Sequence, residues 1–293
     1  MSYRVAIFGS AGQLGAELSN EFTVRGCKLL RLTRQEVDIT DGAKVEKLLT
    51  CFSPDVVINS AAYNMVDVAE QEPLAAYEVN GLAVRHMAAS CRQLDARLVH
   101  FSTDYVFDGA SARPYTESDP THPLGAYAVS KLAGELYAQA YLDNPLIIRT
   151  SGVFGPAGLN TARGNFIELM LRLAASPNPI RVVEDHVASP TYAPALAART
   201  ADLVFGKHSG LFHIGGGTPI SWYDYARKIF DLAGRKPALR ATNEREYRTS
   251  ARRPKYSALS NAKMESLGIQ PMPSLDGAIR EYLAAREKLA VSA

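Results

Sequence analysis

The sequence has few cysteines, almost no net charge and no long hydrophobic run, and each shortage excludes a class of protein. Its three cysteines, Cys27, Cys51 and Cys91, are widely spaced and form neither a disulfide framework nor a CxxC metal pair, which fits a reducing compartment. The 32 basic and 30 acidic residues leave a net charge of +2, too small to favour nucleic acid or an anionic membrane as partner. The sequence contains no run of 18 apolar residues and no signal-peptide pattern. We therefore expect a soluble cytoplasmic protein without a membrane partner.

The composition is that of a globular protein. Hydrophobic residues make up 47% of the chain and charged residues 21%, which excludes intrinsic disorder. The length of 293 residues predicts one large domain or two modest ones. The sequence shows no internal repeat and no low-complexity segment.

Short apolar segments alternate with amphipathic ones over the first 150 residues. Strands are expected at 3–8, 28–32, 55–59, 97–101 and 146–149, and helices at 12–25, 42–51, 73–95 and 123–142. Such alternation indicates βαβ units and a parallel sheet. The strands are continuously apolar, as expected when helices cover both faces. We predict an α/β fold with a doubly wound Rossmann sheet in residues 1–150.

After residue 150 the pattern breaks into short segments separated by prolines and glycines. A strand is expected at 180–183 and a helix at 193–205, and another helix begins near Ser221. We interpret 1–150 as a dinucleotide-binding domain. We interpret 151–293 as a smaller mixed substrate-binding part, from which some segments return to the main sheet.

The first strand is followed by a glycine-rich turn, Gly9-Ser-Ala-Gly12-Gln-Leu-Gly15, which opens the first helix. Gly9 permits a tight turn, Gly12 lets the backbone approach a pyrophosphate, and Gly15 lets the helix pack close to the strand. The helix start offers N–H groups and a positive dipole end to phosphates. The predicted cofactor contacts in this turn are Gly9, Ala11, Gly12, Gln13, Leu14 and Gly15.

The end of the second strand lacks the acidic residue that usually holds an adenosine ribose. Thr33 and Arg34 stand there instead, and a guanidinium suits a 2′-phosphate. We therefore expect NADPH to be preferred over NADH, which stays the alternative cofactor. The alternative for Arg34 is that it is a solvated arginine in a loop. Asp38 and Ile39 are expected against the adenine, or else as a loop acid beside a core aliphatic residue.

Three residues form a candidate reducing centre. Tyr127 and Lys131 are four apart, which places them one turn apart on one helix face. The cation favours the phenolate and makes Tyr127 a proton shuttle near neutral pH. Thr103 follows the fourth strand, where doubly wound sheets bind ligands, and is placed to hydrogen-bond a substrate carbonyl. Without the other motifs, Tyr127 and Lys131 could equally be two neighbouring residues on the solvent-exposed face of a helix.

These motifs resemble the extended short-chain dehydrogenases/reductases, and within them the dTDP-4-dehydrorhamnose reductase family. The most specific match is Ser102-Thr-Asp-Tyr-Val-Phe-Asp-Gly109, followed by a proline-rich approach to Tyr127. The other matching segments are 9–15, 59–70, 79–80, 115–119, 123–135, 149–151, 164–166, 189–191 and 210–214.

The resemblance implies that NADPH delivers hydride to C4 of a nucleotide-linked 4-keto-6-deoxy sugar, as in the conversion of dTDP-4-dehydrorhamnose to dTDP-L-rhamnose. Tyr127 would protonate the new alkoxide, Lys131 would tune Tyr127 and hold the nicotinamide ribose, and Thr103 would position the ketone. The resemblance also implies cofactor contacts from Ala61, Ala62 and Tyr63. The implied substrate contacts are Thr103, Asp104, Val106, Asn165 and Arg253.

Two features of the sequence bear on the substrate and on metals. The family often has tryptophan after Arg149-Thr-Ser151, where this chain has Gly152, so the identity of the sugar stays open. A basic cluster at Arg245, Arg248, Arg252, Arg253 and Lys255 faces two phosphates or forms a solvated loop. Some family members bind magnesium, but we predict no metal site, because the six histidines are scattered without a ligand spacing.

Two other functions stay open. An epimerase or dehydratase would use the same scaffold, although such dehydratases resemble Thr-Asp-Glu at the position of Thr103, and this chain has Tyr105 after Asp104. A non-catalytic subunit, similar to the regulatory β subunit of methionine adenosyltransferase, would keep the same motifs. We expect a nucleotide sugar as the partner molecule, with a homodimer as an open possibility.

Overall fold

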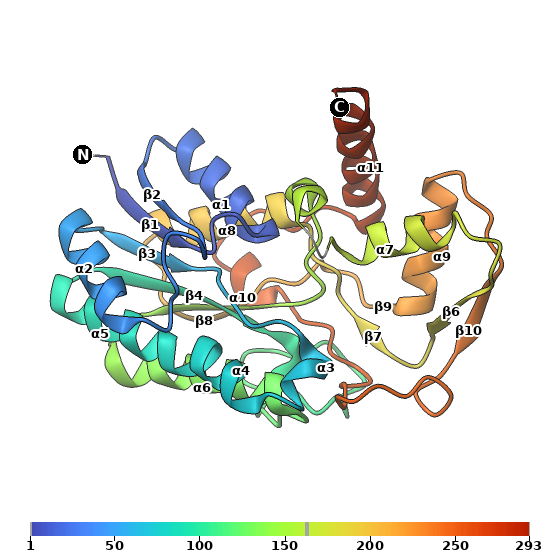
Figure 1. The fold of residues 1–293 in the computed structure, drawn as a ribbon, viewed down its shortest axis with the longest axis horizontal. Coiled ribbons are helices and arrows are strands. Elements are labelled where there is room, and N and C mark those ends of the chain that lie inside the picture. Colours follow the sequence, from blue (N-terminus) through green and yellow to red (C-terminus); the bar gives the residue numbers. More distant parts are fainter. Residues whose placement is uncertain (1, 162–163, 293) are drawn as a thin grey trace.

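A parallel six-stranded sheet forms the centre of the molecule (Figure 1). The structure is a computed structural model and describes residues 2–161 and 164–292. The strand order is β2 (Lys28–Leu32), β1 (Arg4–Phe8), β3 (Val56–Asn59), β4 (Arg97–Thr103), β5 (Leu146–Thr150) and β8 (Gly210–His213). The predicted doubly wound parallel fold is confirmed.

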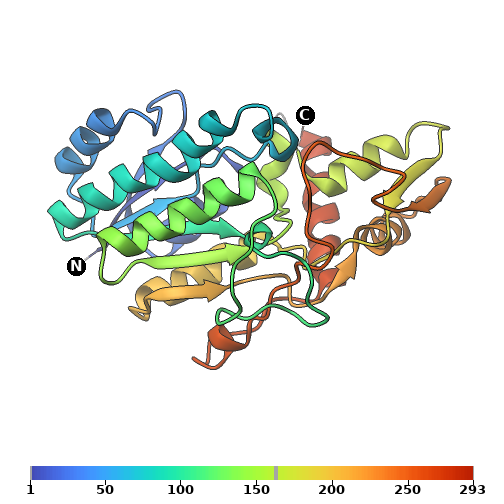
Figure 2. The same ribbon diagram turned by 90° about the horizontal axis from the view of Figure 1, so that it is seen from below.

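Helices cover both faces of this sheet, which explains why its strands are apolar throughout. On one face, α1 (Gln13–Val24) packs beside α8 (Ala193–Phe205), and the short α10 (Ala262–Glu265) adds Met264 to the same core. On the other face lie α2 (Gly42–Phe52), α5 (Ala83–Leu94) and α6 (Ala126–Tyr141), with α5 and α6 side by side (Figure 2). Successive strand residues alternate between the two cores: Val5 and Ile7 face the first, and Ala6 and Phe8 the second.

The helix expected at 73–95 is built from three pieces. It begins as α4 (Pro73–Tyr77), continues as a π-helical turn η1 (Glu78–Leu82) and ends as α5. A short helix, α3 (Val66–Ala69), precedes it. π-Helical turns often occur at functional sites.

Most of the later part of the chain lies beyond the carboxyl ends of the central strands (Figure 1). Two small sheets occur there: β6 (Ile180–Val183) pairs in parallel with β10 (Leu239–Thr242), and β7 (Val187–Ala188) pairs antiparallel with β9 (Ile220–Ser221). The helical elements are η3 (Pro156–Asn160), α7 (Phe166–Leu173), α9 (Trp222–Leu232) and α11 (Leu275–Ser292). They enclose a separate apolar core with Phe154, Tyr225 and Tyr282.

The division at residue 150 stays a prediction. Helix α8 and strand β8, which follow that residue, lie in the main layers. In the described part of the chain, no helix is both long enough and apolar enough to cross a membrane.

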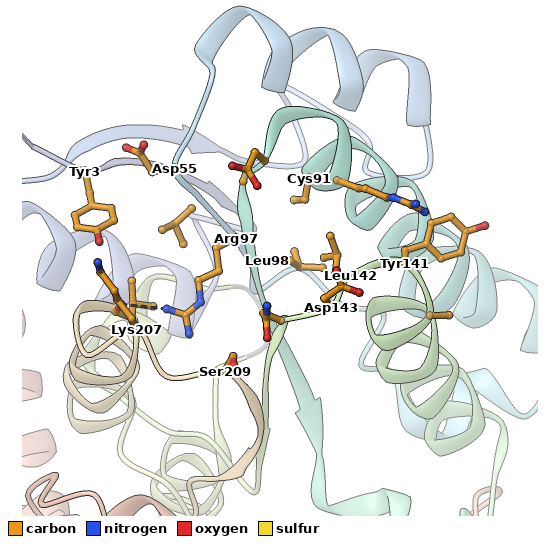
Figure 3. Close-up of a pocket in the computed structure, with 17 residues that line it drawn as sticks. Tyr3, Asp55, Cys91, Arg97, Leu98, Tyr141, Leu142, Asp143, Lys207 and Ser209 are labelled. Carbon is orange, nitrogen blue, oxygen red and sulfur yellow. Dashed lines mark hydrogen bonds between the residues drawn. The ribbon is translucent and has the colours of Figure 1, made fainter.

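The amino-terminal edge of the sheet carries a hollow of about 830 Å³ (Figure 3). Tyr3, Asp55, Arg97 and Lys207 line it, and Arg97 Nη1 donates to the carbonyl of Val204 at 3.1 Å. Ligands of doubly wound sheets bind outside the carboxyl ends of the strands. This hollow therefore lies at the edge opposite to the predicted site residues.

The turn between β1 and α1 depends on two close backbone approaches. Gly9 has φ +76°, and a Cβ there would lie 2.7 Å from the backbone nitrogen of Ala61. A Cβ on Gly15 would lie 2.1 Å from the carbonyl oxygen of Gly9. Only glycine at both positions lets the first turn of α1 and the end of β3 lie this close to β1.

Gly15→Ala is expected to destabilise the fold, because the new methyl group meets backbone atoms rather than a flexible side chain. Overpacking of this kind typically costs about 1–3 kcal/mol, and the thermal midpoint should fall. Gly277→Ala is the matched control: its Cβ would meet only the Ser274 hydroxyl, at 3.1 Å, in the first turn of α11. Equal midpoints for the two variants would contradict the close-packing account.

Candidate active site

The carboxyl ends of adjacent strands bring many predicted site residues to one edge of the sheet. Gly9 follows β1 and Thr33 follows β2. Ala61 follows β3, and Thr103 ends β4. This edge is the expected ligand-binding edge of the fold.

Thr103 and Asp104 form a buried hydrogen-bonded group. The Thr103 hydroxyl donates to Asp104 Oδ1 at 3.2 Å and accepts from the backbone N–H of Tyr105 at 3.2 Å. Asp104 Oδ2 accepts from the hydroxyls of Ser151 at 2.8 Å and Ser257 at 2.5 Å. Burial raises the pKa of Asp104 to about 6, although these donors oppose the shift.

Helix α6 lays Lys131 and Tyr127 against the segment that contains Thr103. Lys131 is 3% exposed, and its Nζ donates to the carbonyl of Phe101 at 2.6 Å. Burial lowers the pKa of Lys131 to about 8, and the charge of Glu135 opposes that shift. Tyr127 lies one turn earlier, with its ring edge-on to Tyr105 at 6.0 Å between centroids. The two contacts, at Phe101 and Tyr105, flank Thr103 on both sides.

A buried ion pair lies behind this group and was not predicted from the sequence. Glu135 accepts from Arg149 Nε at 2.9 Å and Nη2 at 2.7 Å, and both side chains are at most 5% exposed. The hydroxyl of Ser102 also donates to Glu135. The pair therefore joins α6 to β4 and β5 just behind Thr103 and Lys131. Its signal in the sequence is Glu135, four residues after Lys131 and therefore on the same helix face.

Asn80, in the π-helical turn, connects the loop after β3 to α6. Its side chain accepts from the backbone N–H of Tyr63 and donates to the carbonyl of the same residue, both at 2.9 Å. It also donates to the hydroxyl of Ser130 at 3.0 Å. Asn80 thereby fixes the predicted cofactor loop of Ala61, Ala62 and Tyr63 relative to α6. The sequence contained this residue in a matching segment but gave no role for it.

The predicted adenosine contacts lie near the end of β2, in different environments. Arg34 is exposed. Thr33 donates its backbone N–H to Glu36 at 2.6 Å. Asp38 accepts from the backbone and hydroxyl of Thr40, which lowers its pKa, and Ile39 is buried in the core. Asp38 is thus a loop acid and Ile39 a core residue in this structure, and contact of either with the adenine stays a prediction.

Two predicted substrate contacts, Asn165 and Val106, are held by packing and capping contacts within the protein. Asn165 caps α7 by accepting from the N–H of Glu168 at 3.2 Å, and it donates to Gln13 Oε1 at 2.9 Å and to Tyr282 at 3.1 Å. The side chain of Val106 is fully buried in a small apolar cluster with Phe107. In this structure both side chains have packing roles, and their contact with a ligand stays a prediction.

A cavity of about 1280 Å³ lies between the Thr103 region and the later part of the chain. Tyr105 and Arg253 both line it, and Arg253 forms an ion pair with Asp67 at 2.7 Å. The predicted basic cluster lines the same cavity: Arg245, Arg248, Arg252, Arg253 and Lys255. A cavity with these cations suits an anionic ligand.

The raised pKa of Asp104 predicts a pH dependence of stability. The folded protein holds this proton more tightly than the unfolded chain, so stability falls as pH rises from about 4 to about 6 and then levels. Asp104→Asn should remove this fall, and its stability relative to the parent should rise by up to roughly 3 kcal/mol over that range.

Chemical denaturation at a series of pH values measures this difference. Asp38→Asn is the control of opposite sign, because the lowered pKa of Asp38 contributes stability that is lost as pH falls below about 4. A parent-minus-variant difference for Asp104 that does not change with pH would contradict the account.

The comparisons with known proteins agree on one family. The family model described as RmlD substrate binding domain matches residues 3–287. The chain is 38% identical over 291 residues to a dTDP-4-dehydrorhamnose reductase of Mycobacterium tuberculosis, covering 97% of this chain and 93% of the relative. It is 37% identical over 283 residues to the spore coat polysaccharide biosynthesis protein SpsK of Bacillus subtilis, covering 97% and 98%.

Solved structures agree with the fold. The dTDP-4-dehydrorhamnose reductase of Bacillus anthracis in complex with NADP has a TM-score of 0.92 and 32% identity, covering 97% of this chain and 99% of that one. The UDP-glucose 4-epimerase of Thermus thermophilus in complex with NAD has a TM-score of 0.82 at 24% identity, with 94% and 96% covered. At that identity the second likeness shows the fold alone.

Proposed function

The chain belongs to the dTDP-4-dehydrorhamnose reductase family of extended short-chain dehydrogenases/reductases, and we propose on that premise that it reduces the C4 ketone of a nucleotide-linked 4-keto-6-deoxy sugar with NADPH. The reaction is of the type that converts dTDP-4-dehydrorhamnose to dTDP-L-rhamnose. One structural observation carries the chemistry: α6 lays Tyr127 and Lys131 against the end of β4, which contains Thr103.

The glycine turn and the first turn of α1 fit a dinucleotide. Gly12 caps α1 without a side-chain hydrogen bond, so the first N–H groups of the helix remain for phosphate oxygens. The close approach of Gly15 to Gly9 leaves the turn without side-chain bulk. When bound, NADPH supplies the hydride. Lys131 and the loop of Ala61, Ala62 and Tyr63 would orient its nicotinamide half.

Tyr127 is the proposed proton donor to the oxygen at C4. As hydride arrives at carbon, negative charge develops on that oxygen, and a nearby phenol can neutralise it. The ammonium of Lys131, one turn away, stabilises the phenolate left behind. Although burial lowers the pKa of Lys131 to about 8, the group is still mostly charged at neutral pH.

Thr103 is the proposed hydrogen-bond donor to the ketone. Its hydroxyl now donates to Asp104, so it must exchange that partner for the substrate oxygen. Because Asp104 also receives the hydroxyls of Ser151 and Ser257, its carboxylate stays solvated by hydrogen bonds when Thr103 turns away. The basic cavity beside Tyr105 would hold the nucleotide diphosphate, with Arg253 oriented by Asp67.

Arg34→Ala is expected to weaken the preference for NADPH. A charge-assisted contact to a 2′-phosphate is worth about 1.5–3 kcal/mol, so the ratio of kcat/KM for NADPH to that for NADH should fall about 10- to 100-fold. Arg31→Ala, which changes an exposed arginine on β2 that is bonded to Thr23, should leave the ratio unchanged. An equal loss of efficiency with both cofactors in Arg34→Ala would contradict the assignment.

Tyr127→Phe is expected to lower kcat by about 10²–10⁴-fold, because it removes the proton donor and little volume. NADPH affinity, measured by nicotinamide fluorescence, should barely change. Tyr137→Phe on the same helix, which breaks only a bond to Tyr77, should keep normal turnover. Near-normal turnover in Tyr127→Phe would rule out this residue as the acid.

The function itself is tested by mixing the protein with NADPH and dTDP-4-dehydrorhamnose. Loss of the nicotinamide absorbance, with NMR of the product showing a reduced C4, is the expected result. A tightly bound NAD that does not exchange, without net oxidation, would indicate an epimerase or dehydratase. No oxidation, together with co-purification of a methionine adenosyltransferase, would indicate a regulatory subunit. A homodimeric assembly and a cytoplasmic location remain part of the proposal.

A further inference from the structure

Three potential metal ligands meet at one end of the small β6–β10 sheet. Asp185 and His186 follow β6, and Glu244 follows β10. The two strands are parallel, with Val183 opposite Thr242, so their carboxyl ends lie at the same edge. One ligand atom from each of the three side chains lies within 4.8 Å of the other two.

His186 is the member of this set that indicates a ligand. The residue is 7% exposed, and within the described part of the chain its Nε2 has no hydrogen-bond partner. That nitrogen lies 3.9 Å from Glu244 Oε2, too far for a hydrogen bond. A buried imidazole nitrogen facing a carboxylate across such a gap lacks a partner that a cation would supply.

The spacing of the ligand atoms fits a small divalent ion. Zinc–nitrogen and zinc–oxygen bonds are about 2.0–2.2 Å, so two ligands at a tetrahedral angle lie about 3.4 Å apart. The observed separation of 3.9 Å closes with a small rotation of Glu244, whose side chain is 45% exposed. The backbone N–H of Glu244 bonds both carboxylate oxygens of Asp185 at 3.3 Å, which holds the two acidic residues together.

A competing partner for Glu244 is Lys255, whose Nζ lies 3.5 Å away. The Lys255 side chain is 61% exposed, so it can move into solvent when a cation arrives. Lys255 leaves His186 Nε2 without a partner in the described part of the chain, because that nitrogen has no hydrogen bond to any side chain there.

We propose that Asp185, His186 and Glu244 bind a divalent transition-metal ion of the zinc class. One imidazole with two carboxylates suits such an ion better than magnesium, which prefers oxygen ligands alone. His186 and Glu244 line the basic cavity, so the open coordination positions of the ion would take anionic oxygens. The identity of these oxygens rests on the proposed function: they belong to the phosphates of the nucleotide sugar.

The sequence did not predict this set, because Glu244 is far from Asp185 and His186 along the chain and the three residues match no ligand motif. The parallel pairing of β6 with β10 is what brings them together.

Calorimetric titration of the chelator-treated full chain, carrying no histidine tag, with Zn²⁺ tests the site. We expect one ion per chain, and we expect His186→Gln to weaken binding about 100-fold because it removes one of three protein ligands. His208→Gln, which changes a histidine outside the cavity, should bind as the parent does. The parent should bind Mg²⁺ far more weakly than Zn²⁺.

Co²⁺ gives an independent readout, since its visible absorption is strong when the ion is four-coordinate in a protein site and weak in water, and this strong absorption should be lost in His186→Gln. Equal Zn²⁺ affinity in parent and His186→Gln, or less than one ion in five chains, would overturn the proposal. Circular dichroism of His186→Gln must match the parent; if it does not, Glu244→Gln gives the same comparison at an exposed ligand. Because the titration contains neither NADPH nor sugar, its failure leaves the reductase assignment standing, and the reverse also holds.

Discussion

The hydrogen bond from the buried ammonium of Lys131 to the carbonyl of Phe101 is the contact on which the proposed chemistry depends. It fixes α6 against β4, and Tyr127, one turn before Lys131, lies beside Tyr105 as a result. A buried cation is costly unless nearby groups stabilise it. The carbonyl of Phe101 and the charge of Glu135 supply that stabilisation, and Glu135 is in turn paired with Arg149. Helix α6 and strands β4 and β5 are thus joined by one network of buried charges.

The rest of the site is arranged around this fixed centre by short-range contacts. Gly15 lets α1 approach β1, which leaves room for a dinucleotide across the strand ends. Asn80 holds the loop after β3 to α6 through Tyr63 and Ser130. Asp67 forms an ion pair with Arg253, and both residues line a cavity rich in cations.

Local sequence patterns predicted the sheet, most of its helices and the family, because apolar alternation and the glycine turn depend on neighbouring residues. They could not reveal partners that are distant in sequence. Glu135 of α6 pairs with Arg149 of β5, and the Asp185, His186 and Glu244 set exists only because β6 pairs with β10. Asn165 was expected to contact the substrate, and in the structure it caps α7. The sequence Gly164-Asn165 alone does not predict that capping role. The roles predicted for the individual site residues stay predictions.

The central claim is that hydride passes from NADPH to C4 of a sugar held at Thr103 and Tyr127. The most direct measurement uses NADPH deuterated at nicotinamide C4, on each face in turn, with dTDP-4-dehydrorhamnose and NMR of the product. The account predicts deuterium at C4 of the hexose from one face only. A product with no deuterium at C4, or with deuterium from both faces, would contradict it.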